Sequence, residues 1–152
     1  MAFNTITSAN ATFVLTVPGV FPGGVPLIGF GVDDAFVADT VDAAETQVGV
    51  DGYGVMGYRP REVPMSIRFL ASSPSVRLFE TWLAAEDLAN DKLPASGVII
   101  MPSVGLKYAM IYGALMRVST MAEARRVLQN REWKINWLPQ GPGQPAVLSS
   151  PI

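Results

Sequence analysis

The sequence contains no cysteine and no histidine. Their absence excludes disulfides, zinc sites built from these two residue types, and catalytic triads or dyads that depend on a histidine base. Enzymatic chemistry would have to rest on carboxylates, lysine, tyrosine or serine alone. We therefore expect a protein that is not an enzyme and that holds neither a cofactor nor a metal ion.

Charged residues are also scarce. They make up 16% of the 152 residues, whereas 49% of the residues are hydrophobic; soluble domains average about 25% charged residues. A chain of this length usually forms one domain and has enough residues to bury a core. So few charges cannot cover a well-solvated monomer, and we expect much of the exterior to be buried against a partner.

The few charges are distributed unevenly. The chain before Arg59 holds six acidic residues and no basic one, which gives that segment a net charge of −6. The remainder holds eleven basic and seven acidic residues, a net charge of +4. This asymmetry indicates an interaction surface, although a solvated acidic loop explains it equally well. No basic stripe could neutralise a run of phosphates, so tight binding to nucleic acid is not expected.

The first 32 residues carry no charged side chain. Prolines and glycines interrupt this apolar run well before the roughly 20 consecutive residues that a spanning helix needs. The start of the chain also lacks the basic region of a secretory signal. We expect no membrane insertion.

Apolar and polar residues alternate by two along most of the chain, which predicts strands with one face in a core. The clearest such segments are 11–17, 63–69, 106–118 and 125–137, with further candidates at 35–41, 46–50, 53–58 and 98–101. The alternation in the longest segment places six residues on one face: Tyr108, Met110, Tyr112, Ala114, Met116 and Val118. The dipeptide Asp51-Gly52 predicts a hairpin turn, and the short link 120–124 predicts that the two longest strands pair antiparallel.

One segment has a helical period. Ser73 is a good N-cap, Pro74 suits the first helical position, and apolar residues then recur at spacings of three and four. We predict one amphipathic helix over about 74–90. The fold class is mainly β: a β-sandwich or barrel of two packed antiparallel sheets, with one flanking helix and a long hairpin loop.

Two segments rich in proline and glycine remain. The apolar segment 18–31 is predicted to be a loop. The segment 139–152 is predicted to be an extended or loosely attached C-terminal tail. The whole of 1–152 is expected to form a single domain.

Three motifs suggest chemistry, and each has a simpler explanation. The segment 52–57 matches G-x-G-x-x-G, but a strand follows instead of the helix that a dinucleotide site requires. Asp33, Asp34 and the acidic residues after them match neither a calcium loop nor the carboxylate pair of a glycosidase. Trp133 and Trp137, with tyrosines on the neighbouring strand, could stack sugars or bases; aromatic packing in a core explains them with fewer assumptions.

Four short sequence motifs occur in a characteristic order along the chain. They are Val-Gly-Val-Asp-Gly at 48–52, Ala-Ser-Ser-Pro-Ser at 71–75, Leu-Lys-Tyr-Ala-Met-Ile at 106–111 and Trp-Lys-Ile-Asn-Trp at 133–137. Over roughly residues 10–138, this order resembles the small tail tube proteins of contractile-tailed bacteriophages. Their relatives include the inner tube proteins of type VI secretion systems.

The resemblance implies a structural subunit of the virion that is assembled in the bacterial cytoplasm. Six copies would close a ring, and rings would stack into a tube inside the tail sheath. The tube would join the baseplate and the tail terminator protein, and double-stranded DNA would pass through it without specific contacts. The acidic hairpin would contact the next ring or line the channel. The candidate interface or channel residues are Asp39, Asp42, Glu45, Asp51, Tyr53, Lys107, Arg117 and Lys134.

Other functions remain open at this point. The chain could be a carbohydrate-binding, baseplate or fibre module of a virion, a subunit of a type VI secretion tube, or a hydrolase that uses carboxylates. One feature departs from a uniformly negative channel. Lys107, Arg117, Arg131 and Lys134 lie on the last two predicted strands and would bring positive charge to a channel that they faced.

Overall fold

The structure is a computed structural model that describes residues 11–28, 36–121, 124–139 and 141–152. Asp33 and Asp34 lie outside the described residues. The elements are β1 (Thr12–Val17), β2 (Phe21–Pro26), β3 (Phe36–Ala38), β4 (Ala44–Val48), β5 (Gly54–Tyr58), β6 (Val63–Phe69), α1 (Ser75–Ala89), β7 (Ala95–Met101), β8 (Leu106–Arg117), β9 (Arg131–Trp137) and β10 (Val147–Pro151). This confirms the mainly β fold class with one flanking helix and a long hairpin.

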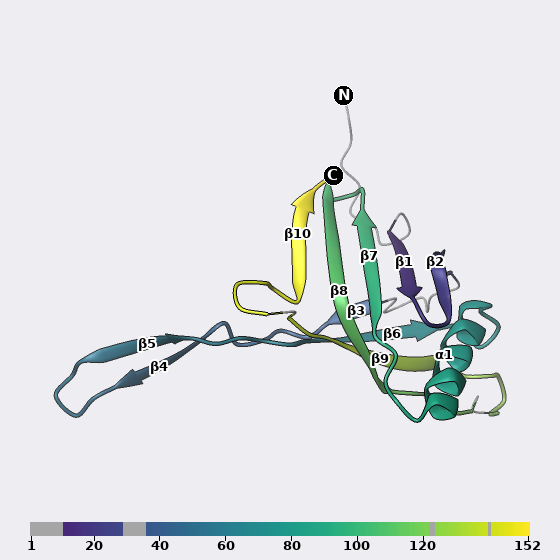
Figure 1. Cartoon of the computed structure of the whole chain (residues 1–152), viewed down its shortest axis with the longest axis horizontal. Helices are drawn as coiled ribbons and strands as arrows, with labels where there is room; N and C mark the ends of the chain where they lie inside the picture. The colour runs from purple at the N-terminus through teal and green to yellow at the C-terminus, as the bar shows by residue number, and fades with distance from the viewer. Residues whose placement is uncertain (1–10, 29–35, 122–123, 140) are drawn as a thin grey trace.

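The described strands form two antiparallel sheets. The larger has the order β2-β1-β7-β8-β9-β6-β3, with β10 added beside β8, and the smaller consists of β4 and β5. In these residues the large sheet stays open and does not close into a barrel. The long strand β8 connects two parts of the large sheet. Its residues 106–110 lie between β7 and β10, and its residues 113–117 pair with β9. Figure 1 shows β6 and β9 running across the direction of β7 and β10.

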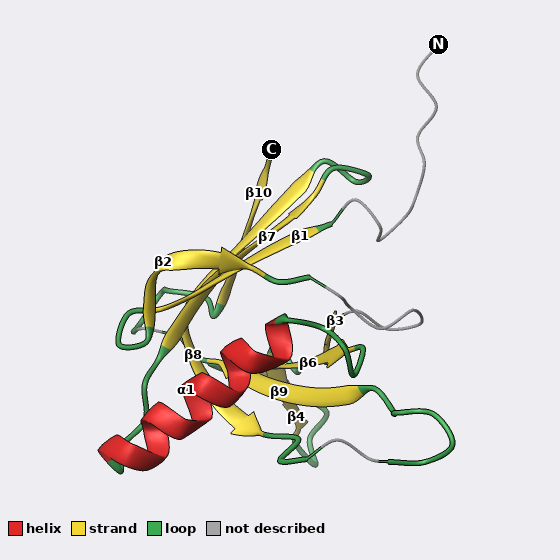
Figure 2. Ribbon diagram, turned by 90° about the vertical axis from the view of Figure 1, so that its right-hand side faces the viewer, coloured by secondary structure: helices red, strands yellow, loops and turns green. Residues whose placement is uncertain are grey.

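The core lies where this bent sheet meets the helix (Figure 2). Helix α1 buries Val76, Phe79 and Trp82, and the Phe79 ring stacks on that of Trp133 with centroids 5.3 Å apart. Trp133 and Trp137 have no exposed surface, which confirms the core interpretation of these residues and removes the stacking platform on β9. No helix in the described part of the chain is long and apolar enough to cross a bilayer.

The single face predicted for the longest strand is wrong because β8 contains a bulge. Met110 and Leu115 are both buried although they lie an odd number of residues apart, and Tyr112 between them is exposed. Ala95 of β7 pairs with Gly113, but Gly97 pairs with Met110, so one extra residue is accommodated on β8. Because side chains alternate, one extra residue moves every later side chain to the opposite face. A glycine within a strand is a typical mark of such a site.

Both segments rich in proline and glycine form strands at the margin of the sheet. The predicted loop 18–31 contains β2, which pairs with β1 and with no other strand among the described residues. Its residues Pro22 and Pro26 can be accommodated because a strand with one neighbour leaves half of its N–H groups unused. The tail predicted over 139–152 ends in β10, which pairs with β8 along its length.

Two predicted strands are shorter than expected. Strand β9 begins at Arg131, and residues 124–130 form a connection with a single bridge between Ala124 and Leu128. Strand β3 covers only Phe36–Ala38 of the predicted 35–41. A strand needs a neighbour for its N–H and C=O groups, and β3 pairs with β6 only at Met65–Ile67.

Serine side chains anchor the start of the helix. The helix begins at Ser75 with Pro74 at the N-cap, one residue later than predicted, and the Ser73 hydroxyl oxygen accepts the N–H of Ser75 at 3.3 Å. The Ser73 hydroxyl also donates to the Ile28 carbonyl, and the Ile28 N–H donates to the Ser75 hydroxyl at 2.8 Å. These bonds attach the end of the β1–β2 hairpin to the first turn of α1.

A buried carboxylate anchors the other end of the helix. The Glu86 side chain is 5% exposed and accepts a bond from Lys92 Nζ at 3.1 Å and one from the Leu93 N–H at 3.2 Å. We expect Glu86→Ala to lower the free energy of unfolding by about 2 kcal/mol, because the partly buried Leu93 N–H would lose its acceptor. Urea denaturation measures this, with Asp87→Ala, on the exposed face of α1, as the matched control. Equal stability of the two variants would contradict the assignment.

Candidate assembly surface

The β4–β5 hairpin projects from the body of the subunit (Figure 1). Its two strands pair with each other from Ala44↔Tyr58 to Val48↔Gly54 and form a sheet of their own. Every residue of both strands is exposed. An isolated two-stranded hairpin is at best marginally stable in water. The arrangement therefore lacks the covering layer that stabilises the rest of the molecule.

The tip of the hairpin is a three-residue loop closed by Gly49 and Tyr53. The Gly49 N–H donates to the Tyr53 carbonyl at 2.8 Å, and Gly52 has a φ of +88°, which suits glycine. The Asp51 carboxylate accepts the Tyr53 N–H at 3.3 Å. The turn predicted at Asp51-Gly52 is confirmed, and it places the Asp51 carboxylate and the Tyr53 ring at the far end of the hairpin.

The hairpin exposes an unusual number of apolar side chains. Met56 is 87% exposed and Val55 is 64% exposed. The other members of this set are Val48, Val50, Tyr53 and Tyr58. Scattered apolar residues are normal on a surface, but a contiguous set marks a site of interaction with another molecule. The sequence signal for this set is the lack of polar alternation over 54–58.

The predicted acidic residues at the base of the hairpin are not free. The Arg59 guanidinium lies 3.5 Å from the Asp42 carboxylate and 3.7 Å from that of Glu45. All three side chains are at least half exposed, so these pairs contribute little to stability. The positive charge of Arg59 partly offsets the negative charge of Asp42 and Glu45 at the base of the hairpin.

The remaining predicted residues lie on the main sheet. Lys134 on β9 contacts Asp39 at 3.4 Å, and Arg117 is opposite Lys134 in the β8–β9 register. Lys107 lies at the other end of β8, opposite Ser150. The structure thus brings Asp39, Arg117 and Lys134 together, groups four others on the hairpin and leaves Lys107 apart from both groups.

Arg131 is buried, which corrects the idea that it could face a channel. Its side chain donates to Glu80 and to the Ser119 carbonyl, and its guanidinium carbon lies 5.3 Å from the centre of the Trp133 ring. A charge with these partners is part of the structure that joins α1 to β9.

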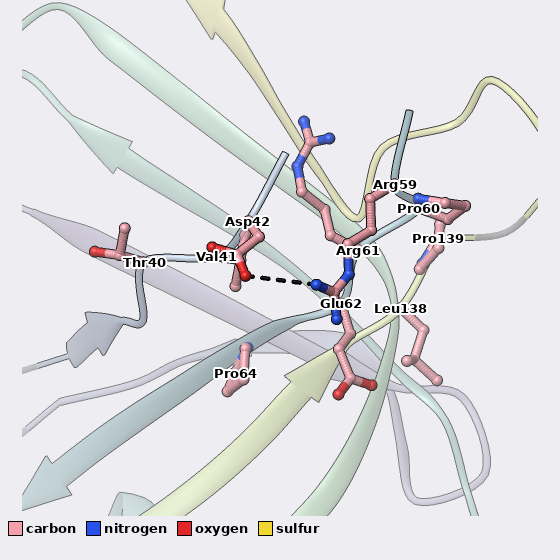
Figure 3. Close-up of a pocket in the computed structure, with 10 residues that line it drawn as sticks. All are labelled: Thr40, Val41, Asp42, Arg59, Pro60, Arg61, Glu62, Pro64, Leu138 and Pro139. Carbon is pink, nitrogen blue, oxygen red and sulfur yellow. Dashed lines mark hydrogen bonds and ion pairs between the residues drawn. The ribbon is translucent and has the colours of Figure 1, made fainter. Parts of the chain in front are cut away.

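Two hollows lie where the hairpin joins the body. The first has a volume of about 510 Å³, and its Asp42–Arg59 pair is drawn as a dashed line in Figure 3. In the same hollow, Glu62 accepts a bond from Asn136 at 2.8 Å. The second, the proline groove, has a volume of about 600 Å³ and is lined by Tyr58, Pro60, Arg61, Pro139, Pro142 and Pro145, together with Gly141, Gly143 and Gln144. The sequence did not point to Arg61 or to this groove.

The first hollow contains acidic side chains that have partners within the subunit. The acidic side chains of the first are already bonded to Arg59 and Asn136. Among the described residues, no three acidic side chains are grouped so that they could hold a metal ion.

Several solved structures share the fold. The cap of the anti-feeding prophage (AFP tube terminating cap) has a TM-score of 0.54 and 8% identity, over 100% of this chain and 95% of that one. A chain of the AFP baseplate, 6-fold symmetrised, has a TM-score of 0.54 and 8% identity, over 99% of this chain and 98% of that one. A chain of the PVC sheath-tube complex of an extracellular contractile injection system has a TM-score of 0.53 and 11% identity, over 92% of this chain and 88% of that one. At these identities the likeness establishes the fold.

No protein with a curated description matches the chain. The family model described as tail fiber protein gp32 matches residues 4–140. Because this match spans most of the sequence, the chain belongs to the family of tail fiber protein gp32.

Proposed function

We propose that this chain is the tube subunit of a contractile phage tail. Six copies form a ring, and rings stack into a tube whose channel carries the genome during ejection. The tube lies inside the sheath and joins the baseplate at one end and a terminator at the other. The subunit is a structural component with no enzymatic activity.

The observation that carries the proposal is the uncovered hairpin. Its strands have no partner besides each other among the described residues, and it exposes six apolar side chains. A copy of the same chain offers a cover that is present at the same concentration in every assembly. A contact between different patches of identical copies repeats, and it closes into a ring or continues as a filament.

The fold supports the same proposal. Three structures that share it come from a tube terminating cap, a baseplate and a sheath-tube complex, and one of them carries six-fold symmetry. The sheath-tube complex belongs to an extracellular contractile injection system. The family of tail fiber protein gp32 supports a structural role in a tail.

Passage of DNA fits the charge distribution. Contacts that release counterions hold a protein on DNA, so a channel should present few of them. Segment 39–62 contains five acidic and two basic residues, and Arg131 is buried away from any channel. Lys107 and Arg117 are exposed on β8, and we propose that they face neighbouring subunits or the sheath.

Terminator or baseplate rings are the second candidate, because chains from a cap and a baseplate share the fold over nearly the full length. The two candidates differ in whether rings stack. A carbohydrate-binding module has less support, because the tryptophans that could have stacked on a sugar are buried.

Sedimentation of the purified subunit tests the proposal. We expect a species of about six times the subunit mass of 16.3 kDa, and larger species as the concentration rises. A species of that mass that never grows would favour a terminator ring. A monomer at every concentration and salt condition would contradict both candidates.

A further inference from the structure

The proline groove contains a cation without a partner. The Arg61 side chain is half-buried, and no hydrogen bond or ion pair involves its guanidinium within the described part of the chain. Arg59 and Arg131, by contrast, each contact a carboxylate. A guanidinium that is partly removed from water favours an anion, and it binds a carboxylate through two parallel N–H bonds.

The tip of the hairpin has complementary features. Asp51 is the only charged residue between Glu45 and Arg59. Its carboxylate bonds only to the N–H of Tyr53 among the described residues, which leaves further acceptor positions. Val50 and Tyr53 lie on either side of it, and the Tyr53 side chain is 78% exposed. The tip thus offers one carboxylate between two apolar side chains.

The walls of the groove fit these flanking side chains. Pro60, Pro139, Pro142 and Pro145 present rigid apolar rings, and Tyr58 adds an aromatic one. Aromatic side chains and arginine are enriched at the centres of protein interfaces. The groove has room for a turn, since its volume is about 600 Å³.

The tip and the groove cannot meet within one subunit. Strand β5 separates them, and its five paired residues keep the tip and the base of the hairpin roughly 15–20 Å apart. Figure 1 shows the tip at the end away from the body. A contact between them must therefore join two copies through different patches, which is the kind of contact that repeats.

We propose that the hairpin tip of one copy, Val50–Tyr53, binds the proline groove of a neighbouring copy, with Asp51 paired to Arg61. The inference rests on the proposed function and names the partner of the hairpin. Each subunit then donates one tip and receives one, so a single contact type links every copy to two others. The apolar tip and the half-buried Arg61 are covered by the same event.

Charge reversal tests the pair. We expect Asp51→Arg and Arg61→Asp, taken singly, to raise the concentration at which oligomers form by about tenfold or more. The double variant restores the pair in the opposite sense and should assemble close to the wild-type concentration. Asp87→Arg makes the same charge change on the exposed face of α1 and should leave assembly unchanged.

Cross-linking tests the contact directly, because the chain has no cysteine of its own. Asp51→Cys subunits mixed with differently tagged Arg61→Cys subunits should form a disulfide-linked dimer under mild oxidation. A mixture of Asp51→Cys with Lys107→Cys is the control and should not.

The outcomes separate this contact from the proposed function. If both single charge-reversal variants form tubes as the wild type does, and no specific cross-link forms, the contact is overturned and the tube function stays intact. Loss of binding to the sheath alone in Arg61→Asp would also overturn it and would assign the groove to the sheath. A wild-type subunit that never forms an oligomer would overturn both.

Discussion

Replacing Gly113 by alanine is expected to lower the free energy of unfolding by about 3 kcal/mol, near the upper end of the cost of overpacking a core. A Cβ atom at this position would lie 2.4 Å from Cζ3 and 2.5 Å from Cε3 of Trp137. The indole cannot retreat, because Trp137 is fully buried and also packs close to Gly97. Gly113→Val should prevent folding. Urea denaturation followed by tryptophan fluorescence measures the effect.

Gly54→Ala is the matched control for this prediction. Gly54 is also in a strand, and a Cβ atom there would meet nothing within 4 Å. Its stability should stay within about 0.5 kcal/mol of wild type. Combining Gly113→Ala with Trp137→Phe should cost less than the sum of the two single changes, because the smaller ring makes room. Additive costs, or a stable Gly113→Ala variant, would contradict the packing at the bulge.

Removing the hairpin is expected to abolish assembly while the subunit stays folded. The Arg59 N–H donates to the Ala43 carbonyl at 3.4 Å, so a short glycine-serine linker can replace residues 44–58. The hairpin contributes no residue to the buried core, and we expect the free energy of unfolding to change by no more than about 1 kcal/mol. Sedimentation should show a monomer at concentrations where the wild type is oligomeric.

A pair of point variants controls for the size of that deletion. Met56 on β5 is 87% exposed and Leu88 on α1 is 90% exposed. Met56→Glu should impair assembly, because a charge would be buried against the partner without a counterion. Leu88→Glu should not. Equal effects of the two variants, or assembly by the deletion variant, would remove the hairpin from the interface.

Most elements of the fold could be predicted because their signals are local. Alternation by two located most of the strands, and a proline after Ser73 marked the start of α1. The bulge in β8 could not be predicted, because apolar residues continue to alternate by two through it in the sequence while the side chains change faces at Gly113. The burial of Arg131 depends on Glu80 and Ser119, which are distant in sequence and lie on other elements.

The assembly surface was predictable only in part. Asp51-Gly52 located the hairpin tip from two residues, and the acidic composition drew attention to its base. Whether the hairpin packs on the body depends on long-range contacts that no local pattern encodes. The proline groove joins residues 58–61 to residues 139–145, and its unpartnered cation is visible only once those segments are side by side.

We propose that this subunit assembles with itself into stacked rings. Electron microscopy of the purified wild-type protein at high concentration tests it most directly. We expect rings with a central channel that stack into tubes, and no such particles from the hairpin-deletion variant. A field of separate monomers from the wild type, or tubes from the deletion variant, would contradict it.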